Sequence, residues 1–455
     1  MNRLIVTFSL LLLPTTLLAQ STIHEQITEN AREIIGTSMG SSEGWDRLTH
    51  LVDYFGPRLS GSEILENSLD WIVEEMKKDD FDSVWTQPVK VPHWVRGEES
   101  ATLNKPIKKD LAMLGLGGSV GTPKIGITAE VMVVNSFDEL EIRKNEAEGK
   151  IVLFNVEFTT YGQTVQYRIN GASAAAKHGA VASIIASVAS YSIQTPHTGV
   201  MRYEEGVEQI PHAAITAEDA LLIQRFVDRG ENVEITLKME AETLPDADSR
   251  NVIAELRGSE FPEEIIVMGG HIDSWDVGQG AMDDGGGCVA AWEALRLIKQ
   301  LGLKPKRTIR VVLWTNEENG LAGANEYKRW AEEDEKSLEN HVLGIESDSG
   351  VFDPIGFGFT GSDEAFEILQ AIGKMLHPID SGSVTRGGGG ADIGPLMRAG
   401  MPGMGLRVNG DKYFWFHHTA ADTIDKLNEQ DFNESVATIA VFAYSVAEIN
   451  ERLPK

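Results

Sequence analysis

Five acidic and histidine positions in the second half of the chain provide ligands that divalent metal ions prefer. They are His271, Asp283, Glu318, Asp348 and one histidine of the pair His417-His418. Imidazole nitrogens and carboxylate oxygens together suit Zn²⁺, with Co²⁺ or Mn²⁺ as possible substitutes. A further carboxylate, Glu317, stands beside this set and is not needed as a ligand. Five ligands and a free base are the inventory of a hydrolase that uses two metal ions.

The chemistry of such a centre explains why each residue type is needed. Two divalent ions about 3.5–4 Å apart need a bridging carboxylate, which an aspartate can provide. A water between the ions loses its proton near neutral pH, and a free carboxylate can pass that proton to a leaving amine. The pair Glu317-Glu318 fits this division. If the segment is extended, adjacent side chains point apart, so one can bind metal while the other faces substrate.

The elements expected around these residues form an α/β fold. Strand-length apolar runs and amphipathic helical stretches alternate in the last two hundred residues: strands at Asn251–Leu256, Ile265–Met268 and Ile309–Trp314, and helices at residues 287–300 and 322–333. This alternation predicts a mostly parallel mixed sheet with helices on both faces. His271 and the pair Glu317-Glu318 each follow one of the strands. Sites in open α/β sheets lie outside the carboxyl ends of the strands, so the placement favours chemistry over a role in the core.

The rest of the chain divides into a leader, a catalytic domain and an insertion. Residues 1–20 combine a basic start, an apolar run and a small residue at the cut, which is typical of a secretory signal. We therefore expect export to the periplasm or the extracellular space. Pro14 interrupts the run, so a membrane anchor is not expected. Residues 21–98 and 247–455 are predicted to form the catalytic domain, interrupted by a β-rich domain over residues 99–246 with one Ala-rich helix at 171–179.

The composition excludes one class of partner. The formal net charge is −29, from 40 basic and 69 acidic side chains. An excess of this size repels phosphate backbones, so nucleic acid is not an expected partner. Most of these carboxylates are expected to lie on a solvated surface.

Four motifs give the chain a resemblance to a known family: Gly270-His-Ile-Asp-Ser-Trp-Asp, Gly280-Ala-Met-Asp-Asp-Gly-Gly-Gly, Trp314-Thr-Asn-Glu-Glu and Phe416-His-His-Thr. Over nearly all of its length after the signal, the chain resembles the co-catalytic dizinc aminopeptidases. The resemblance implies two Zn²⁺ per chain, with Asp283 as the bridging ligand. It also implies the remaining roles: His271 and Asp348 at one metal, Glu318 and His418 at the other, and Glu317 as general base.

The same resemblance supports several finer expectations. It selects His418 over His417 as the ligand, implies a cis peptide bond between Asp283 and Asp284, and implies a homodimer. It also likens residues 99–246 to a protease-associated domain. Asp273 is the expected carboxylate that orients the His271 imidazole, and Asp392 is expected either to contact substrate or to brace a loop. Ala420 stands where relatives often have another histidine.

The sequence thus predicts a secreted zinc-dependent exopeptidase. Its substrates would be dipeptides or short peptides with a free amino terminus, attacked by a metal-bridging hydroxide with Glu317 as general base. Two alternatives stay open. One is a catalytically inactive binding protein on the same fold, and the other is a one-zinc glutaminyl cyclase on a similar fold.

Overall fold

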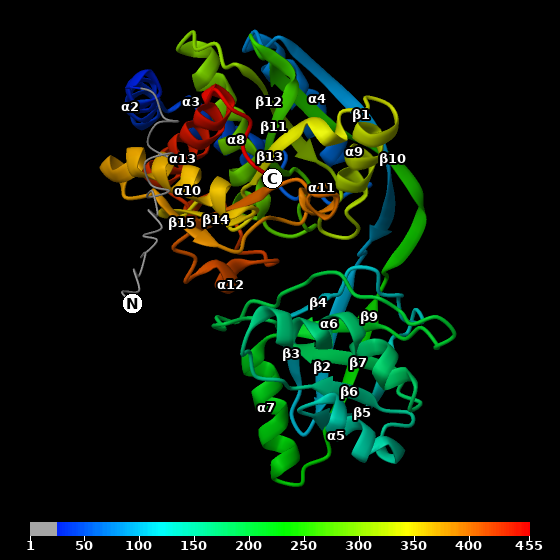
Figure 1. The fold of residues 1–455 in the computed structure, drawn as a ribbon. Coiled ribbons are helices and arrows are strands. Elements are labelled where there is room, and N and C mark those ends of the chain that lie inside the picture. The colour runs from blue at the N-terminus through cyan, green and yellow to red at the C-terminus, as the bar shows by residue number, and fades with distance from the viewer. Residues whose placement is uncertain (1–24) are drawn as a thin grey trace, which may run out of the picture.

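Two eight-stranded sheets organise the protein in this computed structural model, which describes residues 25–455 (Figure 1). The predicted secretory signal lies outside the described residues. The main sheet contains, in spatial order, β1 (Ser83–Val95), β10 (Glu242–Leu256), β12 (Arg307–Trp314), β11 (Phe261–His271), β13 (His341–Glu346), β16 (Gly403–Val408), β14 (Pro354–Thr360) and β15 (Ser383–Arg386). The four strands β12, β11, β13 and β16 are parallel to one another. Antiparallel pairs with β10 and β14 flank them, which confirms the predicted mixed sheet.

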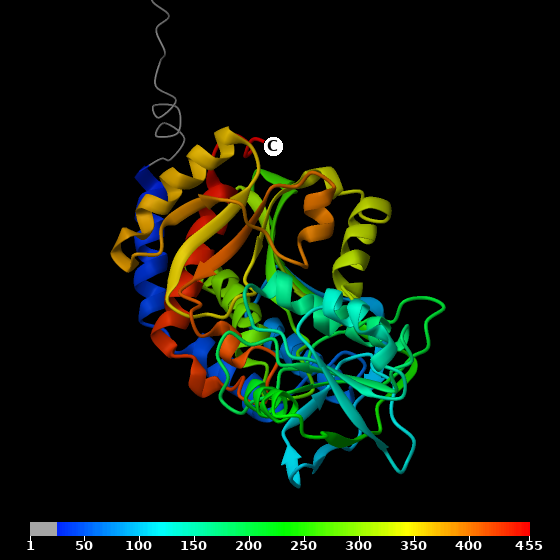
Figure 2. The same cartoon turned by 90° about the horizontal axis from the view of Figure 1, so that it is seen from below.

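Helices cover both faces of the main sheet, as predicted. They are α2 (Glu25–Met39), α3 (Glu43–Tyr54), α4 (Glu63–Lys78), α8 (Gly286–Gln300), α9 (Ala322–Glu333), α10 (Asp363–Gly373), α11 (Gly394–Arg398), α12 (Tyr413–Phe416) and α13 (Glu429–Glu448). Every residue of β12 is buried. Ile309 and Val311 face the core that contains α8 and α13, while Val312 and Trp314 face α9 and α11. Seen from below, the blue α2 and red α13 lie on one side of the sheet and the yellow-green α9 on the other (Figure 2).

The second sheet is built from the segment between β1 and β10, which we call the inserted region (residues 99–239). Its strands are, in spatial order, β3 (Lys109–Leu111), β2 (Glu99–Lys105), β9 (Glu234–Met239), β5 (Ile127–Val134), β6 (Ile151–Phe154), β7 (Ala182–Ala186), β8 (His212–Ile215) and β4 (Met113–Gly115). Strands β5, β6, β7 and β8 run parallel. The helices of the region are α5 (Phe137–Ile142), α6 (Tyr161–Ala176) and α7 (Ala217–Asp228).

The inserted region contains more helix than the sequence predicted: three α-helices instead of one. The single predicted helix at residues 171–179 is the end of α6, which begins ten residues earlier. Its first half has few apolar side chains, yet Thr164, Val165 and Arg168 are buried because tertiary contacts cover that face. Helix α7 begins at a Thr216 cap whose hydroxyl accepts from the Asp219 amide, a signal that the sequence reading overlooked.

A long antiparallel ribbon of β1 and β10 joins the two sheets, with pairing from Ser83↔Glu255 to Val95↔Glu242. It leads out of the main sheet and back again, as the blue and green strands at the side of the molecule show (Figure 1). The predicted boundary at 98/99 falls between β1 and β2, and that at 246/247 falls within β10.

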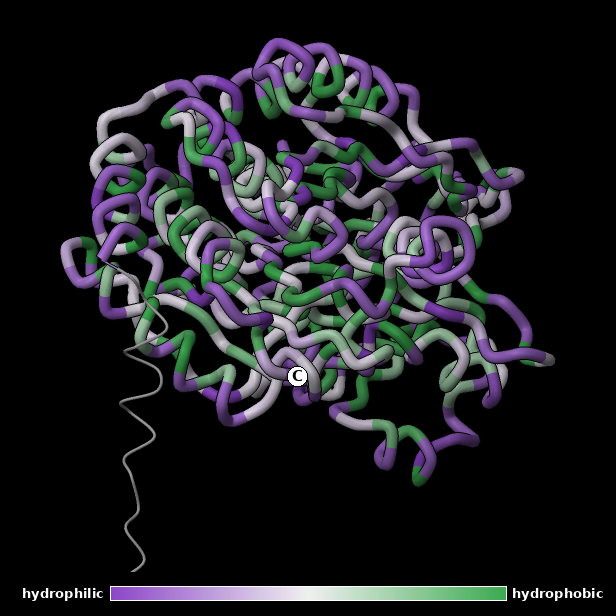
Figure 3. The backbone as a smooth tube through the Cα atoms, turned by 45° about the horizontal axis from the view of Figure 1, so that its top comes forward, coloured by the Kyte–Doolittle hydropathy of each residue, from purple (hydrophilic) through white to green (hydrophobic). Residues whose placement is uncertain are grey.

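Hydropathy follows this architecture: the inner strands are mostly hydrophobic and the outer helical turns largely hydrophilic (Figure 3). In the part of the chain that the structure describes, no helix has the length and apolar character needed to cross a bilayer.

Candidate metal centre

The carboxyl ends of three parallel strands of the main sheet present most of the predicted ligands. Strand β11 reaches His271, so this histidine is the last residue of the strand rather than a residue beyond it. Asp348 follows β13 by two residues. Glu317 and Glu318 lie in a turn after β12, not on the predicted extended segment. The turn still separates them, because Glu318 is buried while Glu317 is partly open to the cavity described below.

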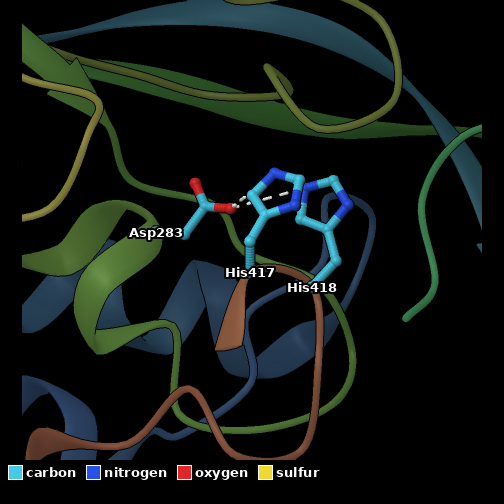
Figure 4. A group of neighbouring side chains, drawn as sticks. All are labelled: Asp283, His417 and His418. Atoms are coloured by element: carbon cyan, nitrogen blue, oxygen red, sulfur yellow. Dashed lines mark ion pairs between the residues drawn. The ribbon is translucent and has the colours of Figure 1, made fainter. Parts of the chain in front are cut away.

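Asp283 lies at the centre of the cluster and belongs to two groups of possible metal ligands. One group combines it with His271 and Asp348, and the other with His417 and His418. Its Oδ1 lies 3.2 Å from His271 Nε2, and its Oδ2 lies 3.3 Å from His418 Nε2. Figure 4 shows the two adjacent histidines directed at the same carboxylate. A carboxylate shared in this way has the position of a bridge between two ions.

The geometry distinguishes the two adjacent histidines. His418 Nε2 lies 3.0 Å from Glu318 Oε2 as well as 3.3 Å from Asp283. His417 Nε2 reaches Asp283 at 3.5 Å, and its ring stacks on that of His418 with centroids 3.5 Å apart. His418 is also held in a left-handed backbone conformation (φ 60°), which is uncommon for a residue with a side chain. This arrangement favours His418 as the ligand beside Glu318.

The turn that presents Asp283 is held by a residue that the sequence reading missed. The carboxylate of Asp422 accepts hydrogen bonds from the amides of Ala281, Met282 and Asp283, at 3.1, 2.8 and 3.2 Å. Asp422 is buried, and burial raises its pKa to about 7. The peptide bond between Asp283 and Asp284 is cis, as expected. Asp422 lies four residues after His418, so one loop supplies both a candidate ligand and the support of Asp283.

Asp273 supports the site in two ways. Its backbone carbonyl lies 2.9 Å from His271 Nδ1, which leaves Nε2 free to face Asp283 and Asp348. Its carboxylate is farther from that ring, at 3.9 Å, and instead accepts from the amides of Glu317 at 3.0 Å and Glu318 at 3.4 Å. The residue therefore joins the end of β11 to the turn after β12.

The residues fit a pair of divalent cations. The buried atoms Asp283 Oδ2 and Glu318 Oε1 accept no hydrogen bond from the described residues, although His418 Nε2 lies 3.3 Å from the former, so both can still bind a cation. Although burial opposes the charged form, Glu318 and Asp283 raise the pKa of His418 to about 10. The carboxylates likewise hold the pKa of His271 well above its usual range despite its burial. Mixed nitrogen and oxygen donors of this kind suit zinc.

A cavity of about 610 Å³ opens onto this cluster. Residues of the main sheet and of the inserted region line it together, among them Glu317, Asp348, Tyr413, Tyr161 and Arg168. Burial and the neighbouring carboxylates raise the pKa of Glu317 well above its usual range. Asp392 is buried and does not line the cavity, so its predicted contact with substrate gains no geometric support and stays a prediction.

The inserted region contacts a candidate ligand directly. The Thr198 amide donates to the His418 carbonyl at 3.0 Å, and the Thr198 carbonyl lies 3.3 Å from His418 Nδ1. The guanidinium of Arg168 lies 3.4 Å from the same nitrogen. The sequence reading assigned no site residue to this region, because a main-chain contact such as that of Thr198 leaves no mark in the residue type.

Comparison with known proteins agrees with the geometry. Residues 251–443 match the model described as peptidase family M28. The chain is 49% identical to carboxypeptidase Q of Mus musculus, with 91% of this chain and 87% of that protein covered. It superimposes on the solved peptidase M28 precursor of Shewanella amazonensis with a TM-score of 0.89 and 36% identity, covering 95% of this chain and 99% of that one.

A more distant solved structure shares the fold. The zinc aminopeptidase of Bacillus subtilis superimposes with a TM-score of 0.67 at 21% identity, covering 90% of this chain and 96% of that one. Identity near one half over almost the whole chain is far more specific than a shared fold. The chain belongs to peptidase family M28.

Proposed function

We propose that this metallo-exopeptidase hydrolyses dipeptides or short peptides with a free amino terminus and binds two zinc ions per chain. The observation that supports the proposal most strongly is that Asp283 belongs to both ligand groups. In this assignment His271 and Asp348 bind one ion, and Glu318 and His418 bind the other. The names of the relatives, a carboxypeptidase and zinc aminopeptidases, support cleavage at a chain end.

In this proposal, the residues of the site have separate roles in hydrolysis. Bound zinc supplies a Lewis acid and lowers the pKa of a water. Glu317 is the candidate general base, because its carboxyl faces the cavity and its amide is held by Asp273. Its raised pKa suits a group that takes a proton from water and gives it to the leaving amine. Asp422 and Asp273 keep the bridging aspartate and the Glu317 turn in place.

Export and self-association belong to the same proposal. The predicted signal at residues 1–20 supports delivery to the periplasm or the extracellular space, and the family resemblance supports a homodimer. Size-exclusion chromatography with light scattering on the purified protein measures the second point directly.

Dipeptide hydrolysis by the purified protein, with and without a chelator, tests the activity. We expect turnover with zinc bound, loss of turnover after chelation, recovery on adding zinc, and two zinc per chain by elemental analysis. A metal-loaded protein that hydrolyses no dipeptide would favour the inactive binding protein. A firm stoichiometry of one zinc per chain would favour the glutaminyl cyclase reading.

A further inference from the structure

Arg168, on the first half of α6, is a buried cation without a counter-ion among the residues that the structure describes. The residue is only 4% exposed. Its Nη2 donates to the Tyr161 hydroxyl at 2.9 Å, and its Nη1 donates to the Thr198 carbonyl at 3.4 Å. Its Nε has no hydrogen-bond partner, and no carboxylate oxygen of residues 25–455 lies within ion-pair distance of it. A buried charge left in this state costs free energy, which an incoming anion would offset.

The position of Arg168 relative to the candidate metals limits what that anion can be. Arg168 lines the same cavity as Asp283, Glu318 and Asp348. One imidazole ring, that of His418, separates its guanidinium from the carboxylates: Nδ1 lies 3.4 Å from Arg168, and Nε2 lies 3.0 Å from Glu318. An anion bound by Arg168 would therefore lie in the same cavity as the candidate metal ligands, one imidazole ring away from Glu318.

The other cations that line the cavity are placed differently. Arg202 and Arg407 are both exposed, and the guanidinium of Arg407 donates to the Thr385 hydroxyl at 2.6 Å. Solvent screens exposed charges of this kind, so each contributes little to binding. Arg168 alone among the three is desolvated, and a desolvated guanidinium binds a carboxylate strongly through two parallel N–H···O bonds.

We propose that Arg168 is a specificity-determining residue that binds the C-terminal carboxylate of the substrate, one residue beyond the scissile bond. One residue of extended peptide spans about 3.5 Å, and a charge-assisted hydrogen bond adds about 2.8 Å. We expect this combined reach to bring the carboxylate to Arg168, which one imidazole ring separates from Glu318. The proposal rests on the proposed peptidase function and narrows it, because a carboxylate at that point makes the dipeptide the preferred substrate.

The inserted region packs closely against the guanidinium and fixes its position. Gly199 lies against it so closely that a Cβ added there would be 2.2 Å from Nη1. Tyr161 occupies the other side through its hydroxyl. Main chain and side chain of the inserted region thus fix the guanidinium from two sides while it still lines the cavity.

The test compares a dipeptide with its amide on the zinc-loaded full chain. Alanyl-leucine and alanyl-leucinamide share the amino terminus and the scissile bond and differ only in the terminal charge. We expect kcat/KM of the wild type to favour the free acid by roughly 100-fold. Arg168→Gln should remove this preference by lowering kcat/KM for the acid, while Arg168→Lys should retain part of it. Arg407→Gln removes the same charge from the same cavity and should leave the preference within about twofold.

Three results would overturn the assignment. Equal kcat/KM for acid and amide in the wild type would contradict carboxylate recognition while leaving the peptidase function intact. Equal losses on both substrates in Arg168→Gln, or loss of zinc from that variant, would show that Arg168 only supports His418. Alanyl-glutamic acid α-amide tests the other source of a carboxylate, and an Arg168-dependence as strong as that of alanyl-leucine would assign the residue to an acidic side chain. Failure of the proposed function looks different, since neither acid nor amide would be hydrolysed.

Discussion

The two sheets have a similar build but present opposite charges to the same cavity. Each contains four successive parallel strands with antiparallel neighbours. In the main sheet, the strand ends bear His271, Glu318 and Asp348. In the second sheet, the chain continues from β6 into α6 with Arg168, and from β7 into the loop with Thr198. Carboxyl ends of parallel strands are favoured sites for ligands in α/β sheets, and here both sheets use them for one cavity.

The difference between these two sets of strand ends suggests a division of labour. The main sheet supplies acidic and imidazole groups, which are buried and need a cation beside them. The inserted region supplies a buried guanidinium, which needs an anion, and a main-chain contact to His418. The candidate metal centre and the proposed substrate-binding cation thus belong to separate sheets, which the ribbon of β1 and β10 joins. Each half of this division can be tested by substitution.

The largest effects are expected at the main-sheet turn that contains Glu317 and Glu318. Glu317→Gln should lower kcat by roughly 1,000-fold, because a general base contributes about that much, while both zinc ions stay bound. Glu318→Gln should lower the zinc content, because its carboxylate lies 3.0 Å from His418 Nε2. Elemental analysis and dipeptide kinetics on the two variants give the comparison. A near-normal rate in Glu317→Gln would show that another group is the base.

The main-sheet half of the site could be predicted from sequence because each ligand type stands in a glycine-rich motif or directly after an apolar strand. His271 has both signals, Asp283 has the first, and Glu318 follows the apolar run Ile309–Trp314. The bounds were less accurate: β11 extends beyond the predicted Ile265–Met268 at both ends, since tertiary pairing with β12 and β13 lengthens it. The turn at Glu317 was predicted as extended because a single sequence does not show where a chain reverses.

The contribution of the inserted region could not be predicted for physical reasons. Thr198 acts through its amide and carbonyl, which every residue type offers. Arg168 lies on a helix with no metal or catalytic motif, and 250 residues separate it from His418. Asp422 lies three residues beyond the motif Phe416-His-His-Thr, and its role depends on three amides of a turn that is distant in sequence. Such contacts come from the fold and not from local pattern.

Substitution of Arg96, which connects the ribbon to both sheets, should have the next largest effect on stability and activity. Arg96, at the end of the ribbon, donates to both carboxylate oxygens of Asp276 at 2.8 and 2.6 Å and to the Thr198 hydroxyl at 3.2 Å. Arg96→Gln should cost about 2 kcal/mol of unfolding free energy, because it leaves the partly buried Asp276 carboxylate without its cation. It should also raise KM, because Thr198 positions His418. Urea unfolding and dipeptide kinetics measure both effects.

The matched control for that prediction is Arg329→Gln. Arg329 pairs with Glu326 and Glu333 on α9 and with Asp334 just after it, but its side chain is 42% exposed and solvent screens these pairs. We expect little change in stability or KM. If Arg96→Gln behaved like Arg329→Gln, the ribbon alone would hold the two sheets together and the Arg96–Asp276 contact would be dispensable.

The smallest expected effect concerns how the unfolding free energy depends on pH, because each sheet contains a buried histidine with a lowered pKa. Burial lowers the pKa of His212 in β8 and of His341 in β13 to about 4. Both side chains are neutral in the folded protein, whereas the unfolded chain binds a proton near pH 6.5. Stability is therefore lost as the pH falls from 6.5 towards 4, and each histidine should account for about 2 kcal/mol of loss between pH 7 and pH 5.

Replacing each histidine tests whether the sheets unfold together. His212→Asn and His341→Asn should each make the unfolding free energy less dependent on pH over that range. His341→Asn should cost more at pH 7, because His341 has two ring contacts, with Tyr327 Oη and the Ser337 carbonyl, and His212 has one, with the Tyr167 carbonyl. An unchanged pH dependence in both variants would contradict the neutral assignment. If hydrogen exchange shows the effect of His212→Asn only in residues 99–239, the inserted region opens independently, and the cation it presents to the cavity can move away from metals that stay in place.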